Sequence, residues 1–245
     1  MIDSINDKLT VDCLFHGQIK VLQEKRGYRF SIDAVILAHH VSSIPYERAV
    51  DLGTGCGVIP IILAYRKPSG HIYGVEVQKT LAELARKNVF LNKMEDRISI
   101  IDQDLKEIEK VFGSASFDLV FSNPPYRRLN SGRINPYSQR AIARHEIMAT
   151  LEDIVKCASH ILINRGRMVV IYLAERIVDL VVKMREFDIE PKLLRTIHAY
   201  DDSEAKLIIL EGIKGGKPGL KIGQPLVIYT GNSSYTEEIK EMLEG

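Results

Sequence analysis

The residues Ala49-Val-Asp-Leu-Gly-Thr-Gly-Cys-Gly57 indicate the type of fold, because an apolar strand runs directly into three glycines at alternate positions. A strand that ends in such a loop before a helix brings backbone amides close to a ligand at its carboxyl end. A dinucleotide fingerprint would need Gly-x-Gly-x-x-Gly, but the position that follows Gly57 is Val58. Asp51 also places a carboxylate at the start of the loop, which repels pyrophosphate and can organise a ligand with an ammonium group. The loop therefore disfavours a dinucleotide.

Short apolar segments alternate with helical stretches from Asp51 onward, which predicts a parallel sheet with helices on both faces. The predicted strands are residues 49–52, 72–75, 98–101, 117–121 and 168–173, and the predicted helices are 58–65, 79–91, 105–112, 151–163 and 174–187. Residues 193–199, 205–211 and 226–229 predict further strands, including a closing antiparallel pair. The glycine-rich segment 212–221 reads as a loop. The fold class is therefore α/β, a doubly wound and mostly parallel sheet with an antiparallel C-terminal strand.

The N-terminal residues predict a small hairpin over 13–15 and 18–23, and a helix over 32–41 that Ser31 could cap. We assign residues 1–48 to this hairpin and helix extension. Residues 49–245 form the main domain, as a single folding unit.

Composition excludes several classes of protein. With 245 residues, 27% charged and 45% hydrophobic, the chain can bury a full core. The net charge of +1 means that nucleic-acid binding would need a local basic patch. The three cysteines have no metal-ligand spacing, so we expect no metal site, and they suit a reducing compartment. No signal peptide or membrane span is evident, so we expect a cytoplasmic protein with no membrane contact.

Two further acids stand at predicted strand ends. Glu76 ends the second strand, where a carboxylate can bind both ribose hydroxyls, and Asp104 follows the third, where it can accept from an adenine amino group. Together with the glycine loop, they resemble the S-adenosylmethionine site of Rossmann-like class I methyltransferases. That resemblance implies S-adenosylmethionine as the cofactor. The residues that would hold it are Asp51, Gly53, Thr54, Gly55, Gly57, Glu76, Val77, Asp104, Leu105 and Asn123.

The segment Asn123-Pro124-Pro125-Tyr126 follows the predicted strand 117–121 and resembles the catalytic motif of methyltransferases that act on a planar nitrogen. The lone pair of such a nitrogen is delocalised, so the enzyme must draw it back by accepting hydrogen bonds from the two N–H groups. The side-chain oxygen of Asn123 and the carbonyl of Pro124 can supply these acceptors, and proline offers no competing N–H. Tyr126 can stack on a base. We therefore predict that all four residues are catalytic.

The motif alone does not separate adenine from the side-chain amide of glutamine, which has the same planar NH₂ group. A basic segment after Tyr126 favours a nucleic acid, because phosphate contacts need such a rim. Its candidate RNA-binding residues are Arg127, Arg128, Arg133, Arg140, Arg144 and His145. The last two could instead begin the helix after Glu146. A second basic cluster is formed by Lys214, Lys217 and Lys221.

Three flanking segments narrow the resemblance: Gly27-Tyr-Arg-Phe-Ser-Ile-Asp-Ala34, Ala143-Arg-His-Glu146 and Pro225-Leu-Val-Ile-Tyr229. With the central motifs, they resemble the bacterial tRNA1(Val) (adenine(37)-N6)-methyltransferases over essentially the whole chain. The resemblance implies tRNA as the partner, with no obligate protein partner evident, and places Ser31 and Asp33 near the cofactor. Protein glutamine-N5 methyltransferases share the Asn-Pro-Pro-Tyr motif but usually carry a longer helical N-terminal domain. A catalytically inactive protein that binds the cofactor or RNA is a further alternative.

Overall fold

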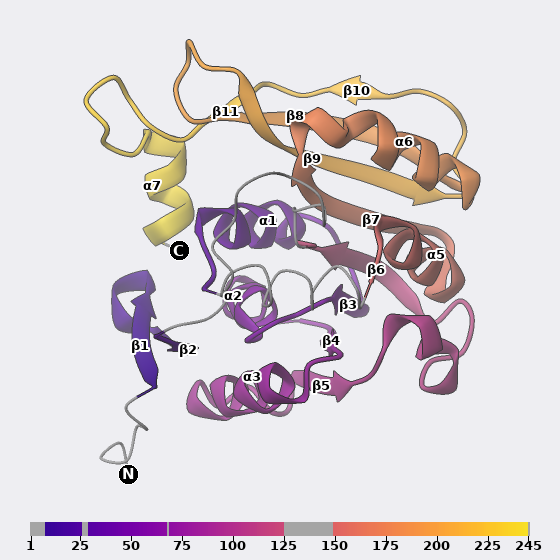
Figure 1. The fold of residues 1–245 in the computed structure, drawn as a ribbon, viewed down its shortest axis with the longest axis horizontal. Coiled ribbons are helices and arrows are strands. Elements are labelled where there is room, and N and C mark those ends of the chain that lie inside the picture. Colours follow the sequence, from indigo (N-terminus) through magenta and orange to yellow (C-terminus); the bar gives the residue numbers. More distant parts are fainter. Residues whose placement is uncertain (1–7, 26–28, 68, 125–148, 245) are drawn as a thin grey trace, which may run out of the picture.

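The computed structural model describes residues 8–25, 29–67, 69–124 and 149–244. Within them, a nine-stranded sheet forms the centre of the molecule (Figure 1). Its strands are β3 (Arg48–Leu52), β4 (His71–Glu76), β5 (Ile98–Asp102), β6 (Phe117–Ser122), β7 (Leu162–Leu173), β8 (Ile189–His198), β9 (Ala205–Lys214), β10 (Lys221–Ile222) and β11 (Leu226–Val227). The helices are α1 (Ile32–Ser42), α2 (Val58–Arg66), α3 (Lys79–Leu91), α5 (Leu151–Ile161), α6 (Ile177–Glu186) and α7 (Glu237–Glu244).

The strand order is β10-β8-β9-β7-β6-β3-β4-β5, and β11 also pairs with β8. Strands β7, β6, β3, β4 and β5 pair in parallel, whereas β9 is antiparallel to both β7 and β8. The sheet is therefore mostly parallel with an antiparallel C-terminal strand, as the sequence predicts.

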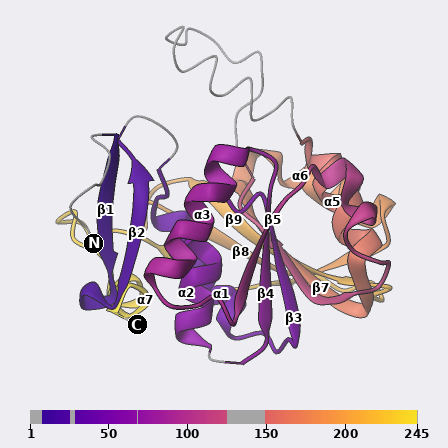
Figure 2. The same ribbon diagram turned by 90° about the horizontal axis from the view of Figure 1, so that it is seen from below.

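Helices cover both faces of the sheet (Figures 1 and 2). One core cluster contains buried residues of α1, α2, α3 and α7, and a second contains those of α5 and α6. Successive residues of β3 pack on opposite faces of the sheet, since Ala49 belongs to the first core cluster and Val50 to the second. A strand that is buried on both faces has no polar side to alternate with, which explains why the apolar run is continuous.

The N-terminal hairpin consists of β1 (Leu9–Leu14) and β2 (Ile19–Glu24), and it stands beside α3 (Figure 2). Its buried residues Phe15, Ile19 and Val21 belong to the same core cluster as α1 and α2. The sequence locates the hairpin, but the predicted first strand, 13–15, is shorter than β1, while the predicted second strand, 18–23, has the length of β2 and lies one residue earlier. The division of the chain at residue 48 into an extension and a main domain stays a prediction.

Several elements differ from the sequence-based expectation. Residues Leu105–Lys110 form a 3-10 helix in which Glu107 departs from helical geometry, and a 3-10 turn at Ala174–Arg176 precedes α6. Strand β7 begins at Leu162, directly after α5, because Leu162 already pairs with Phe117 of β6. Helix α7 and the short edge strand β10 were not expected. None of the helices described is long and apolar enough to cross a bilayer.

The buried ring of Phe117 offers a test of this core. It contacts the rings of Tyr73 and Phe112 at centroid distances of 5.4 and 4.8 Å, and its side chain is fully buried. We expect Phe117→Ala to lower the free energy of unfolding by about 3–5 kcal/mol, because it leaves a cavity as well as losing apolar burial. The matched control is Phe90→Ala, whose side chain is 71% exposed and should cost about 0.5 kcal/mol or less. Equal losses of the two variants in urea denaturation would contradict this packing.

Candidate active site

The predicted functional groups meet at the carboxyl ends of four adjacent strands. Within β3, Asp51 pairs with Phe121 of β6 on one side and with Gly74 of β4 on the other. Asn123 follows Phe121 by two residues, and Glu76 pairs with Asp102 at the end of β5. The strand order therefore sets out the ends of β6, β3, β4 and β5 in a row. In open α/β sheets, ligands bind at this edge, where the connections diverge to the two sides.

The glycine loop between β3 and α2 is tightly constrained. Gly53, Gly55 and Gly57 all have positive φ, at 80, 58 and 81°, which L side chains rarely adopt. A Cβ atom on Gly57 would lie 3.1 Å from Cβ of Ala85 in α3. A Cβ on Gly53 would meet nothing within 4 Å, so the loop is open at that point. The backbone can therefore come close to a ligand on the Gly53 side while its other side rests on α3.

Asp51 is completely buried at the base of this loop. Its Oδ2 accepts a hydrogen bond of 2.8 Å from the Thr54 hydroxyl, while its buried Oδ1 has no hydrogen-bond partner among the described residues. Burial raises the pKa of Asp51 to about 7, with a further contribution from the charge of Glu76, against the opposing hydrogen bond from Thr54. Leaving a buried carboxylate oxygen unpaired costs stability, so it marks a position that a cationic group would satisfy.

Glu76 is held in one orientation by backbone donors on both sides. Its Oε2 accepts from the Gly55 N–H and its Oε1 from the Gln78 N–H, each at 2.9 Å. The side chain is 6% exposed. These two bonds fix the plane of the carboxylate, and each carboxylate oxygen can accept from more than one donor.

The remaining predicted cofactor residues lie at the ends of β4 and β5. Asp104 is half-buried and its side chain accepts from the Lys106 N–H at 2.9 Å, which caps the 3-10 helix Leu105–Lys110. The Leu105 side chain is buried in the second core cluster, so only its backbone can face a ligand. Val77 is half-buried just after Glu76. Assignments of these residues to the cofactor remain predictions.

Asn123 is brought to the start of α1. Its side-chain Nδ2 donates to Oδ2 of Asp33 at 3.1 Å. Ser31 stands at the N-cap position of α1, but its hydroxyl donates to Asp33 Oδ1 instead of capping the helix backbone. Pro124 is buried beside Asn123. The predicted residues Pro125 and Tyr126, and the candidate RNA-binding residues Arg127, Arg128, Arg133, Arg140, Arg144 and His145, lie outside the described residues.

Two polar residues that the sequence analysis did not select support the site. The Asn88 side chain, completely buried, accepts from Leu22 N–H at 2.7 Å and donates to the carbonyls of Leu22 and Cys56 at 3.0 and 2.9 Å. It thereby ties the hairpin to the glycine loop. The hydroxyl of buried Ser122 donates to Leu52 carbonyl at 2.7 Å and joins the ends of β6 and β3. The sequence contained a signal for Asn88, because this polar residue lies in the apolar stripe of the predicted helix 79–91, four positions after Leu84.

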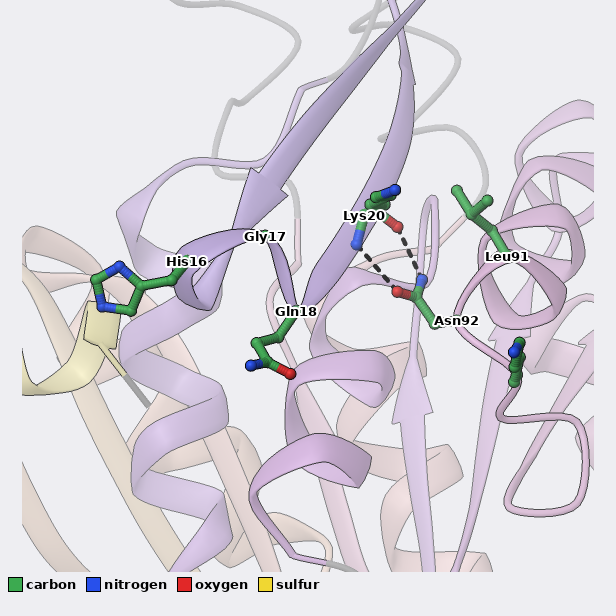
Figure 3. A pocket seen from close by; sticks show the side chains of 7 residues that line it. His16, Gly17, Gln18, Lys20, Leu91 and Asn92 are labelled. Carbon is green, nitrogen blue, oxygen red and sulfur yellow. Dashed lines mark hydrogen bonds between the residues drawn. The ribbon is translucent and has the colours of Figure 1, made fainter. Parts of the chain in front are cut away.

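A separate hollow of about 440 Å³ lies between the turn of the hairpin and the end of α3 (Figure 3). Asn92 there exchanges hydrogen bonds with the backbone of Lys20, at 2.9 and 2.8 Å. Since α3 begins after the carboxyl end of β4 and runs away from it, this hollow is at the opposite end of α3 from the row of acids. None of the predicted cofactor residues lines it. In the described part of the chain, no group of three potential metal ligands occurs.

The Asp51 oxygen that lacks a partner among the described residues, the oriented Glu76 carboxylate and the open glycine backbone fit S-adenosylmethionine, which carries an ammonium group and a ribose. The fold and this site define a class I, Rossmann-like methyltransferase. Consistently, the methyltransferase small domain family matches residues 29–185. A solved structure described as a predicted O-methyltransferase from Agrobacterium tumefaciens shares the fold, with a TM-score of 0.69 and 21% identity, and covers 86% of this chain and 94% of its own. The M. jannaschii TYW2 structure, in complex with AdoMet, has a TM-score of 0.57 and 13% identity over 85% and 86% of the two chains.

A comparison of sequences resolves the family further. The tRNA1(Val) (adenine(37)-N6)-methyltransferase of Porphyromonas gingivalis is 30% identical over 210 residues, which cover 83% of this chain and 81% of the relative. The chain belongs to the tRNA1(Val) (adenine(37)-N6)-methyltransferase family. It is an enzyme, and its methyl donor is S-adenosylmethionine.

Asp51 predicts a pH dependence of cofactor binding. Because its pKa of about 7 lies above the ordinary value, the ligand-free protein takes up a proton on Asp51 as the pH falls through 7. Only the ionised form attracts an ammonium group, so the Kd of S-adenosylhomocysteine should rise about tenfold between about pH 8 and pH 6. Isothermal titration calorimetry at both pH values measures this change.

Asp51→Asn is the matched variant, since the amide oxygen can still accept from Thr54. It should bind S-adenosylhomocysteine more weakly at pH 8 and lose most of the pH dependence. Because folding raises the pKa of Asp51, the free energy of unfolding falls as the pH rises from the pKa of Asp51 in the unfolded chain to about 7. Asp51→Asn removes this loss, so the variant should be more stable than the wild-type protein at pH 8 by about 2–4 kcal/mol. Tight, pH-independent binding by the variant would contradict the role of Asp51.

Proposed function

We propose that this enzyme transfers the methyl group of S-adenosylmethionine to the exocyclic N6 nitrogen of adenosine 37 in a valine tRNA. The relative from P. gingivalis bears the name of that activity. The observation that carries the proposal for this chain is the position of Asn123. Asn123 follows the end of β6, which pairs with β3, the strand that runs into the glycine loop, and its side-chain nitrogen donates to Asp33.

The chemistry needs acceptors rather than a strong base. The N6 lone pair of adenine is delocalised into the ring, and hydrogen bonds from both N6–H groups to the Asn123 amide oxygen and the Pro124 carbonyl would localise it. As positive charge grows on N6, these hydrogen bonds strengthen, so they stabilise the transition state more than the ground state. Ser122 supports both residues, because its hydroxyl fixes the end of β6 to Leu52.

The bound cofactor supplies a methyl group on a positively charged sulfur. The residues of this chain bind and orient it: Asp51 through the ammonium group, Glu76 through the ribose hydroxyls, and Asp104 through the adenine amino group. Because these acids lie at successive strand ends beside Asn123, they hold donor and acceptor at one edge of the sheet. Such alignment contributes much of the rate acceleration of a transfer reaction.

A tRNA anticodon loop suits the basic segment that follows Tyr126. An unpaired base can be turned into a pocket at lower cost than a base in a duplex, and Tyr126 would stack on it. With a net charge of +1, the chain depends on local arginines for phosphate contacts. Because the proposed substrate is a tRNA, we propose a cytoplasmic location for the enzyme. The proposal requires no metal and no obligate protein partner.

The decisive experiment is transfer of labelled methyl groups to total tRNA from cells that lack this enzyme, followed by mass spectrometry of the digested nucleosides. The proposal expects N6-methyladenosine, recovered from valine tRNA. Label only in protein glutamine would assign the chain to the glutamine-N5 methyltransferases. Cofactor binding without transfer to any RNA or protein would indicate a non-catalytic protein.

Replacement of Asn123 tests the catalytic role. We expect Asn123→Ala to lower kcat for tRNA methylation by about 10²–10³, by analogy with the loss of one preorganised hydrogen bond in other transfer enzymes. The affinity for S-adenosylhomocysteine, measured by calorimetry, should change little. A loss of activity below about fivefold with intact cofactor binding would refute the role.

The basic segment can be tested against a matched pair of cations. The double variant Arg127→Gln/Arg128→Gln should weaken tRNA binding and reduce the slope of log Kd against log salt concentration by about two, one for each lost phosphate contact. Lys217→Gln/Lys221→Gln serves as the control, because these exposed residues adjoin the half of β8 that is remote from the carboxyl edge. An equal effect of both pairs would mean that net charge alone attracts the tRNA.

A further inference from the structure

The hydrogen bond between Asn123 and Asp33 joins residues that are 90 positions apart in the chain. Asn123 follows β6, whereas Asp33 lies in the first turn of α1. The Nδ2 to Oδ2 distance of 3.1 Å is that of an ordinary hydrogen bond. The contact therefore connects the proposed catalytic amide to an element that precedes the glycine loop.

Asp33 is itself held rigidly. Its side chain is 6% exposed, and its Oδ1 accepts from the Ala34 N–H at 2.9 Å and from the Ser31 hydroxyl. The N-terminus of a helix favours a negative charge because its first N–H groups point toward it. One carboxylate oxygen is thus bound to the start of α1, and the other is directed at Asn123.

An ionised carboxylate can only accept hydrogen bonds, so it must face the NH₂ group of the Asn123 amide and not its oxygen. This orientation turns the amide oxygen away from Asp33. The opposite orientation would place the two acceptor oxygens of Asp33 and Asn123 together and present an NH₂ group to the substrate amine. Two NH₂ groups that face each other have only donors to offer, so that orientation could not bind adenine N6.

We propose that Asp33 is a positioning residue, which fixes the Asn123 amide so that its oxygen accepts from the substrate amine. This inference rests on the proposed function, in which that amine is adenine N6. Asp33 acts in two ways. It removes the rotational freedom of the amide before the substrate arrives, and its charge polarises the amide so that the oxygen becomes a stronger acceptor.

This role differs from the direct contact with the cofactor that the family resemblance implies for Asp33. A cofactor ligand would act on the Kd of the cofactor, whichever residue stands at position 123. A positioning residue acts on kcat and only through Asn123. The two roles therefore make opposite predictions in a double-mutant cycle.

The test is the cycle of Asp33→Ala, Asn123→Ala and the double variant, with kcat for tRNA measured at saturating cofactor. We expect Asp33→Ala to lower kcat about 10–50-fold in the wild-type background and less than about twofold in the Asn123→Ala background, as for coupled residues in contact. The Kd of S-adenosylhomocysteine should stay within about threefold. Equal losses in both backgrounds, or a loss confined to cofactor affinity, would overturn the proposal.

A control separates positioning from general loss of structure. Asp118 also accepts two hydrogen bonds, from the N–H groups of Glu47 and Arg48 at 2.9 and 2.8 Å, but at the other end of β3. Asp118→Ala should lower thermal stability and leave kcat of the folded protein within about twofold. If Asp118→Ala lowers kcat as much as Asp33→Ala does, the effect of Asp33 is structural.

A second readout does not require activity. The side-chain NH₂ resonances of Asn123, identified by their loss in Asn123→Ala, should shift and exchange faster with solvent in Asp33→Ala. Unchanged resonances would refute the contact itself. Should the wild-type enzyme fail to methylate tRNA while these resonances respond to Asp33→Ala, the proposed substrate would be wrong and the Asp33–Asn123 contact would stand.

Discussion

The site depends on the parallel register of β3 between β6 and β4. Backbone hydrogen bonds place Asp51 opposite Phe121 and Gly74, and this pairing fixes where each strand ends. A shift of one residue would exchange the buried faces of β3, so the core enforces the register. Because Ser122 also binds Leu52 carbonyl, the end of β6 cannot slide against the loop. The spacing between Asn123 and the acids thus follows from sheet geometry.

Burial of acids at this edge is costly, and the structure offsets only part of the cost. Glu76 receives two backbone N–H groups, whereas Asp51 receives one hydroxyl and keeps a buried oxygen without a partner among the described residues. The pKa of Asp51 is raised because the single hydrogen bond from Thr54 does not offset the burial of its charge. In the proposed complex, the ammonium group of the cofactor would supply the missing cation, so the feature that lowers the stability of the free protein would contribute to cofactor affinity. Functional sites commonly trade stability in this way.

The N-terminal segment takes part in the site rather than merely preceding it. The Asn88 side chain forms hydrogen bonds with the backbone of Leu22 in β2 and with the Cys56 carbonyl of the glycine loop. Farther along, Asp33 reaches Asn123. Residues that precede β3 therefore help to hold both the glycine loop, which would bind the methyl donor, and the Asn123 amide, which would bind the acceptor.

Local patterns in the amino-acid sequence are enough to predict the alternating α/β order, the glycine loop and the acids at the ends of β3 and β4, because periodicity and turn chemistry depend on neighbouring residues. The sequence also located Asn123, while the 3-10 geometry of Leu105–Lys110 and the long start of β7 escaped it, since those depend on pairing and packing with distant residues. The contact of Asp33 with Asn123 and the hydrogen bond from Asn88 to the Cys56 carbonyl are visible only in the folded protein. Such contacts depend on the order of the strands in the sheet. That order is set by backbone pairing between distant segments, so the local spacing of residue types along the sequence does not predict it.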